Sequence, residues 1–186
     1  KELFSAQKYT VPATNRSDKR VVESTNYFVY STNITKFYDQ KVNGGFQSYS
    51  TGTGASLVWT ANHHNMDMVF VVLGCTRQYY ENGWQVKVYG NFEEAQTLMN
   101  YVYSNFKATR ILYNGQALKQ FHVSGADNDM VAEPHLDLDT ILPNDAHMDN
   151  LIMEYTDTGL TAPITKGDMV ATVQVWYRNT CLHEAE

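Results

Sequence analysis

Residues 56–73 constrain the fold most, because they have the pattern of two strands joined by a short polar turn. The strands are expected at residues 56–61 and 66–73, with the turn at Asn62-His63-His64-Asn65. The second strand contains a continuous apolar run, Val69–Leu73. Such a run is typical of a strand that is buried on both faces. We therefore expect a β-hairpin in a sheet that other elements cover on each side.

Residues 91–106 have the pattern of an amphipathic helix. Apolar side chains recur at steps of three and four residues, which places them on one helical face: Phe92, Ala95, Met99, Val102 and Phe106. Asn91 suits the N-cap, and Glu94 then occupies the capping-box position. The apolar face is expected to pack against the 56–73 hairpin.

The rest of the chain favours short strands. Asn114-Gly115 lies between the strand-like runs 109–113 and 116–123, which predicts a hairpin with a two-residue turn. Further strands are expected near residues 130–132, 150–155 and 169–177. Closely spaced strands with frequent turns predict a small all-β sandwich. Residues 1–45 look irregular, and their runs 21–22 and 27–30 could form brief strands.

The charge changes where the pattern changes. Residues 1–108 carry ten basic and eight acidic groups, or +2, whereas residues 109–186 carry four and twelve, or −8. We therefore predict two domains, 1–108 and 109–186, in an α+β chain. The total of −6 argues against a nucleic-acid-binding protein, and no apolar run approaches the roughly 18 residues of a transmembrane helix. The two cysteines exclude a disulfide-dense scaffold.

Six segments carry a resemblance to a known family, and their order matters more than any one of them. They are residues 9–17 (YTVPATNRS), Thr25-Asn26, 37–42 (FYDQKV), the 57–74 hairpin, 91–106 and 160–168 (LTAPITKGD). In this order they resemble the C-terminal half of the low-molecular-weight penicillin-binding D-alanyl-D-alanine carboxypeptidases, a serine-type family. The resemblance implies a partial antiparallel sheet of the penicillin-binding/β-lactamase type with a helix, followed by a small all-β sandwich.

Catalysis in this family requires a serine nucleophile in S-x-x-K, then S-x-N, then K-T-G on a sheet strand. Ser5-Ala6-Gln7-Lys8 fits the first pattern, but it directly precedes the 9–17 segment, whereas the family's nucleophile lies far upstream. Ser24-Thr25-Asn26 fits the second pattern, but it falls on the family's Thr-Asn segment. We expect Asn26 to be a loop residue that bonds to the backbone. No catalytic residue is therefore assigned.

The K-T-G position can be placed in two ways. An ungapped alignment back from residues 57–61 puts Phe46, Gln47 and Ser48 there; the alternative, Ser50-Thr51-Gly52, keeps Thr and Gly but deletes four residues. The resemblance implies that the family's lysine binds the terminal carboxylate of the substrate. Neither alignment keeps it. Losing a charged hydrogen bond costs about 1.5–3 kcal/mol.

Other clusters predict neither a metal nor a cofactor. His63-His64 is expected in a solvated turn, and the remaining histidines (His122, His135, His147 and His183) lack the spacing of zinc ligands. Asp127-Asn128-Asp129 lacks the glycine and glutamate of a calcium loop. Tyr79-Tyr80, with Trp84 nearby, could stack on sugars, although a packed sheet edge is the simpler interpretation.

The resemblance implies a chain that is part of, or a diverged relative of, a serine-type D-Ala-D-Ala carboxypeptidase acting on cell-wall peptidoglycan. This chain alone is expected to be catalytically inactive. The alternative is a non-catalytic protein that binds the cell wall or has an architectural role there. The expected location is extracellular, on the cell-wall or membrane-surface side in bacteria. One expected partner is a peptidoglycan stem peptide. The 91–106 helix can cover only one face of the hairpin sheet, so the other face is expected to bind a second copy of the chain or a polypeptide that carries the nucleophile half. Alternatively, residues 1–45 cover this second face.

Overall fold

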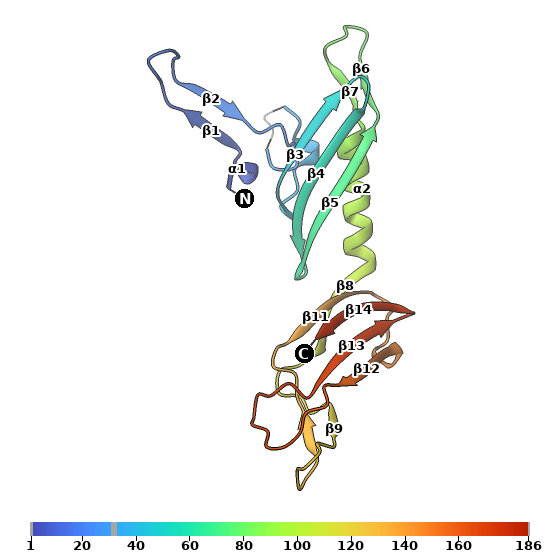
Figure 1. The fold of residues 1–186 in the computed structure, drawn as a ribbon. Coiled ribbons are helices and arrows are strands. Elements are labelled where there is room, and N and C mark those ends of the chain that lie inside the picture. The colour runs from blue at the N-terminus through green and yellow to red at the C-terminus, as the bar shows by residue number, and fades with distance from the viewer. Residues whose placement is uncertain (1, 31–32, 186) are drawn as a thin grey trace. The chain divides into compact units, whose positions relative to one another are not determined.

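The computed structural model of the chain describes residues 2–30 and 33–185 (Figure 1). It divides into two compact units, one ending at Asn105 and one beginning at Phe106, three residues before the boundary that the sequence predicts. The first unit contains α1 (Glu2–Ser5), β1 (Lys8–Val11), β2 (Arg20–Glu23), η1 (Thr35–Phe37), β3 (Val42–Ser50), β4 (Gly54–His63), β5 (Met66–Cys75), β6 (Arg77–Tyr79), β7 (Val86–Tyr89) and α2 (Gly90–Asn105).

The centre of the first unit is an antiparallel sheet in the order β3-β4-β5. The expected hairpin is confirmed as β4 and β5, but its turn is shorter than predicted. Asn62 and His63 remain in β4, and only His64 and Asn65 form the turn, with φ of 51° and 61°. Positive φ at both positions is the geometry of a two-residue type I′ turn, whose twist matches that of the strands.

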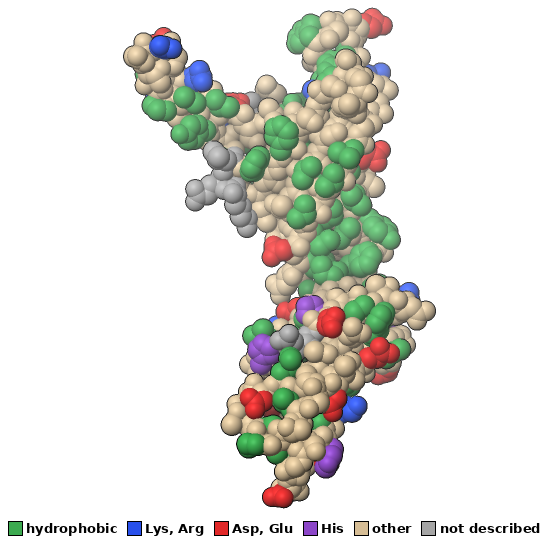
Figure 2. All heavy atoms as spheres, in the orientation of Figure 1, with side chains coloured by type: hydrophobic (Ala, Val, Ile, Leu, Met, Phe, Trp, Pro, Cys, Tyr) green, Lys and Arg blue, Asp and Glu red, His purple; other side chains and the backbone are tan. Residues whose placement is uncertain are grey.

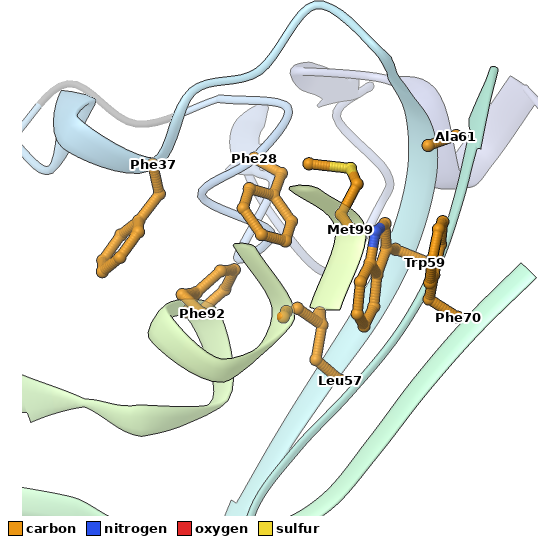
Figure 3. Close-up of a cluster of buried hydrophobic side chains, with 9 residues drawn as sticks. Phe28, Phe37, Leu57, Trp59, Ala61, Phe70, Phe92 and Met99 are labelled. Carbon is orange, nitrogen blue, oxygen red and sulfur yellow. The ribbon is translucent and has the colours of Figure 1, made fainter. Parts of the chain in front are cut away.

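Helix α2 covers one face of this sheet, as the sequence predicts. Its buried side chains Phe92, Ala95 and Met99 pack in one core with Leu57 and Trp59 (Figure 3). The other buried members of this core are Phe28, Phe37, Ala61 and Phe70. Apolar burial of this kind is what stabilises a short helix.

The predicted N-cap role of Asn91 is wrong. The helix begins at Gly90, so Asn91 lies inside it, and its buried side-chain amide donates to the Ser56 carbonyl oxygen at 3.5 Å. The reason is the close approach of the helix start to the preceding chain. The Gly90 amide donates to the Thr76 carbonyl oxygen at 2.9 Å, and a Cβ at Gly90 would lie only 2.3 Å from that oxygen.

The opposite face of the sheet is open in this chain, so the expected burial of Val69–Leu73 on both faces is wrong. Val69, Val71 and Leu73 are 69%, 50% and 73% exposed. Figure 2 shows hydrophobic side chains spread over this face. The physical reason is that α2 reaches only one side, and the described part of residues 1–45 does not cover the other. The interpretation of residues 1–45 as an internal cover is therefore also wrong.

Within residues 2–30 and 33–45 the chain is more ordered than its composition indicates. Strands β1 and β2 pair as an antiparallel hairpin, which includes the predicted run 21–22. The run 27–30 forms a turn instead of a strand, because Asn26 organises it and Phe28 enters the core. The sequence alone did not indicate this packing.

The second unit is a small sandwich. Its elements are β8 (Phe106–Leu112), β9 (Lys119–Phe121), β10 (Met130–Ala132), β11 (Leu138–Pro143), η2 (Met148–Asn150), β12 (Leu151–Asp157), β13 (Ala171–Tyr177) and β14 (Thr180–Ala185). β8 pairs with β11, β9 pairs with β10, and β12-β13-β14 form a third sheet. Ile111 and Leu112 of β8 share a buried core with Val173 and Val175 of β13.

The predicted hairpin at Asn114-Gly115 is wrong, although a turn does form there. Gly115 has φ of 73°, and the Gln116 amide donates to the Tyr113 carbonyl oxygen at 3.0 Å. However, β8 pairs with β11 instead of with residues 116–123. Arg110 of β8 donates to both Asp137 and Asp139, which adds contacts between β8 and the β11 segment. A turn signal fixes only the local bend.

We expect residues 106–186 to fold alone, because the two units have separate cores. A fragment that starts at residue 109 should melt at a lower temperature, since it loses three of the six residue pairs between β8 and β11. Circular dichroism of both fragments during heating measures this. A molten product from 106–186 would show that the second unit depends on the first, and equal melting temperatures would contradict the role of Phe106–Ala108.

Candidate functional site

The positions that the sequence analysis aligned with K-T-G lie on and next to an edge strand. Phe46, Gln47 and Ser48 are inside β3, whereas Ser50 ends this strand and Thr51 and Gly52 lie in the turn before β4. Phe46 is 61% exposed and forms a row across the sheet with Val58 and Val71. These three side chains define the centre of the open face. Gln47 points to the covered side, where its Oε1 has no hydrogen-bond partner among the residues that the structure describes.

A groove of about 400 Å³ lies beside Phe46. Its other lining residues are Phe4, Ala6, Tyr9, Val22, Glu23, Ser24, Thr25 and Gly45. None of these lining residues is Lys or Arg. A groove of this composition suits an apolar group and offers no cation to a carboxylate.

Gly45 allows β3 to lie close to β4 beside Phe46. A Cβ at this position would lie 2.5 Å from the Val58 carbonyl oxygen and 2.8 Å from the Trp59 Cα atom. Both are backbone atoms, which cannot move aside as the end of a side chain can. The edge strand that carries Phe46 is therefore built around a glycine.

Ser5-Ala6-Gln7-Lys8 does not form a serine–lysine pair of the family's kind. On a helix, residues three apart are neighbours. Here α1 ends at Ser5, and Lys8 begins β1. The Lys8 amine donates to Glu23 at 2.8 Å, and this hydrogen bond, with a further one to Tyr30, raises the pKa of Lys8 above its usual range. Lys8 is thus held as a charged ion-pair partner.

Asn26 of Ser24-Thr25-Asn26 is a structural residue, as predicted. It is buried, its side-chain Oδ1 accepts from the Phe28 backbone amide at 3.1 Å, and its backbone amide donates to Ser24 Oγ at 3.2 Å. The side chain therefore organises the turn that brings Phe28 into the core.

The remaining polar clusters are engaged in contacts within the chain. The His63 ring lies beside the His64 ring in a tilted arrangement, with ring centroids 3.7 Å apart. Asp129 accepts from His122 Nδ1 at 3.2 Å, and Asp137 and Asp139 bind Arg110. Within residues 2–30 and 33–185, no three His, Cys, Asp or Glu side chains are grouped to hold a metal ion. The same part of the chain contains no helix that is long and apolar enough to span a membrane.

Three solved structures share this architecture. Penicillin binding protein 5 from Haemophilus influenzae matches 99% of this chain and 48% of its own, with a TM-score of 0.63 at 21% identity. The peptidoglycan synthesis regulatory factor PBP3 from Streptococcus pneumoniae matches 90% and 43%, with 0.62 at 20% identity. The chain has a penicillin-binding-protein fold. The D-alanyl-D-alanine carboxypeptidase DacD from Francisella tularensis matches 91% and 38%, with 0.56 at 15% identity.

The chain thus spans less than half the length of each of these penicillin-binding structures, as expected for a C-terminal half. No protein-family model and no curated protein sequence matches it. The α+β class, with an antiparallel sheet and helix followed by a small β-sandwich, is confirmed. The groove beside Phe46 was missed by the sequence analysis, because Phe4, Tyr9 and Val22 come from α1, β1 and β2 and meet only through tertiary packing.

Proposed function

We propose that this chain is part of, or a diverged relative of, a serine-type D-Ala-D-Ala carboxypeptidase that acts on cell-wall peptidoglycan. The observation that carries the proposal is the penicillin-binding-protein fold, with the K-T-G-equivalent residues on its edge strand β3. The ungapped placement is the better supported one, because Phe46–Ser48 lie within a strand whereas Thr51 and Gly52 lie in a turn. The corresponding location is outside the cytoplasm of a bacterium.

The chain alone is proposed to be inactive. Phe46 cannot supply positive charge to a terminal carboxylate, and none of the residues that line the groove beside it is Lys or Arg. Lys8 is bound to Glu23, so it is a poor general base for Ser5. The same two observations, the lack of a positive charge at Phe46 and the Lys8–Glu23 ion pair, favour a second function, which is non-catalytic binding to the cell wall.

The open face of the sheet supports a missing half. Phe46, Val58 and Val71 form one row, and Val69 and Leu73 flank it on β5. An exposed apolar surface of this kind marks an interaction site. The matched structures are more than twice as long as the part that this chain spans. We therefore propose that the remaining half of such a domain covers this face, or that a second copy does so in isolation.

No stable acyl adduct is expected when the chain is incubated with labelled penicillin, because it lacks the nucleophile and the lysine. Intact-protein mass spectrometry measures this, with an active low-molecular-weight carboxypeptidase as the positive control. A stoichiometric mass gain on Ser5, Ser48 or Ser50 would contradict the proposed placement of the motif. Restoring the charge with Phe46→Lys should not by itself produce an adduct, since the nucleophile is still missing.

A further inference from the structure

The tip of the β6–β7 hairpin is a preorganised turn. The Tyr80 amide donates to the Gln85 carbonyl oxygen at 2.9 Å, and the Gly83 amide donates to the Tyr80 carbonyl oxygen at 2.9 Å. The Asn82 Oδ1 accepts from the amides of Trp84 and Gln85 at 3.3 and 3.0 Å. An asparagine that bonds to the backbone ahead of it fixes a turn. The side chains of residues 80–85 are therefore carried on an ordered backbone.

This ordered tip presents aromatic rings to solvent. Trp84 is 76% exposed and Tyr80 is 51% exposed. Figure 2 shows hydrophobic side chains together with an acidic one at this tip. Large aromatic side chains that the fold does not bury are typical of binding surfaces, since they offer contact area at low entropic cost.

The base of the hairpin is packed against the sheet through aromatic side chains. Arg77 lies over the rings of Tyr49, Tyr79 and Tyr89, with 4.8, 5.7 and 5.8 Å from its guanidinium carbon to the ring centroids. Tyr79 and Tyr49 lie 6.1 Å apart by ring centroids. Tyr49 belongs to β3, so the hairpin is attached to the strand that carries Phe46. The sequence interpretation of a packed edge therefore fits Tyr79 but not Tyr80 or Trp84.

A pocket of about 400 Å³ opens between the rings of Tyr79 and Tyr80 and the polar side chains of the hairpin. It is lined by Tyr79, Tyr80, Glu81, Asn82, Gln85 and Lys87. The lining offers two phenol rings, two amides, one carboxylate and one ammonium group. Amides and charged groups provide both donors and acceptors, and aromatic rings provide flat apolar faces.

We propose that the β6–β7 tip binds carbohydrate, as a chain of pyranose rings with equatorial substituents. Such rings have apolar C–H faces that stack on Tyr80 and on the exposed Trp84 of the same turn, and hydroxyl edges that bond to Glu81, Gln85 and Lys87. One acid and one base give the pocket no net charge, which disfavours a polyanion. The amide and charged side chains of the tip also disfavour insertion into a bilayer. This site goes beyond the proposed function, and it uses none of the K-T-G-equivalent residues.

The test is calorimetric titration of the whole chain with chitotetraose and, separately, cellotetraose. Saturable binding of at least one probe is expected, weakened roughly tenfold or more by Trp84→Ala and by Tyr80→Ala. Tyr38→Ala is the matched control, because Tyr38 is a similarly exposed aromatic residue of the same unit, and it should leave the affinity unchanged. Circular dichroism verifies that each variant is folded.

Failure of both probes to bind would overturn the proposal, as would equal weakening by Tyr38→Ala. Binding of phospholipid vesicles that is lost in Trp84→Ala, without binding of either sugar, would assign the tip to a membrane surface instead. None of these results depends on an acyl adduct with penicillin, so the carbohydrate site and the proposed function can fail separately.

Discussion

Replacing Trp59 with alanine is expected to destabilise the first unit by about 3–5 kcal/mol, which is the usual cost of removing a large buried aromatic side chain. Trp59 is fully buried at the centre of the sheet. Its ring stacks on the Phe70 ring, with centroids 4.9 Å apart, and its centroid lies 5.8 Å from that of Phe28. Figure 3 shows these three side chains together in the core. No neighbouring side chain can fill the resulting cavity without moving the sheet or α2.

Urea denaturation followed by circular dichroism measures this loss. Because the units have separate cores, the second unit should unfold at an unchanged urea concentration. Trp84→Ala is the matched control: it removes the same side chain from an exposed turn, so its effect should stay within about 0.5 kcal/mol. Equal midpoints for wild type and Trp59→Ala would contradict the position of Trp59 in the core.

The second large effect is expected on the open face of the sheet. We expect the isolated chain to self-associate through Phe46, Val58 and Val71, because an apolar face next to unpaired strand edges favours pairing with another chain. Val71→Lys should weaken this association by roughly a hundredfold or more, since an unpaired buried charge costs about 3–5 kcal/mol. The fold itself should be unaffected, because Val71 is half exposed in the single chain.

Size-exclusion chromatography with light scattering, over a wide range of concentrations, tests this. The matched control is Ile152→Lys, which places the same charge at an exposed β-branched residue of β12 in the second unit. Ile152→Lys should leave the oligomeric mass that light scattering measures unchanged. A wild-type chain that stays monomeric at every concentration would contradict association through this face. Addition of a separately produced nucleophile half of a carboxypeptidase would then test the other proposed occupant.

Local patterns were sufficient for several elements. The 3.6-residue period of Phe92, Ala95 and Met99 predicted α2 and its buried face, because a helix can bury only the residues that recur on one side. The strand expected near residues 169–177 is β13, in which apolar side chains at every second residue, Val173, Val175 and Tyr177, are buried. The order of short motifs was enough to indicate the penicillin-binding-protein fold, now supported by structures of only 15–21% identity.

By itself, therefore, the sequence determined the strongly patterned elements, such as α2 and the β4–β5 hairpin, and the fold that the order of its motifs indicates. Tertiary structure decided which surfaces meet. It paired β8 with β11 instead of with the segment after Asn114-Gly115, and it left Val69, Val71 and Leu73 exposed. It also formed the groove beside Phe46 from distant residues. The physical reason is range: periodicity and turn chemistry act over a few residues, whereas strand pairing and burial depend on partners that are distant along the chain.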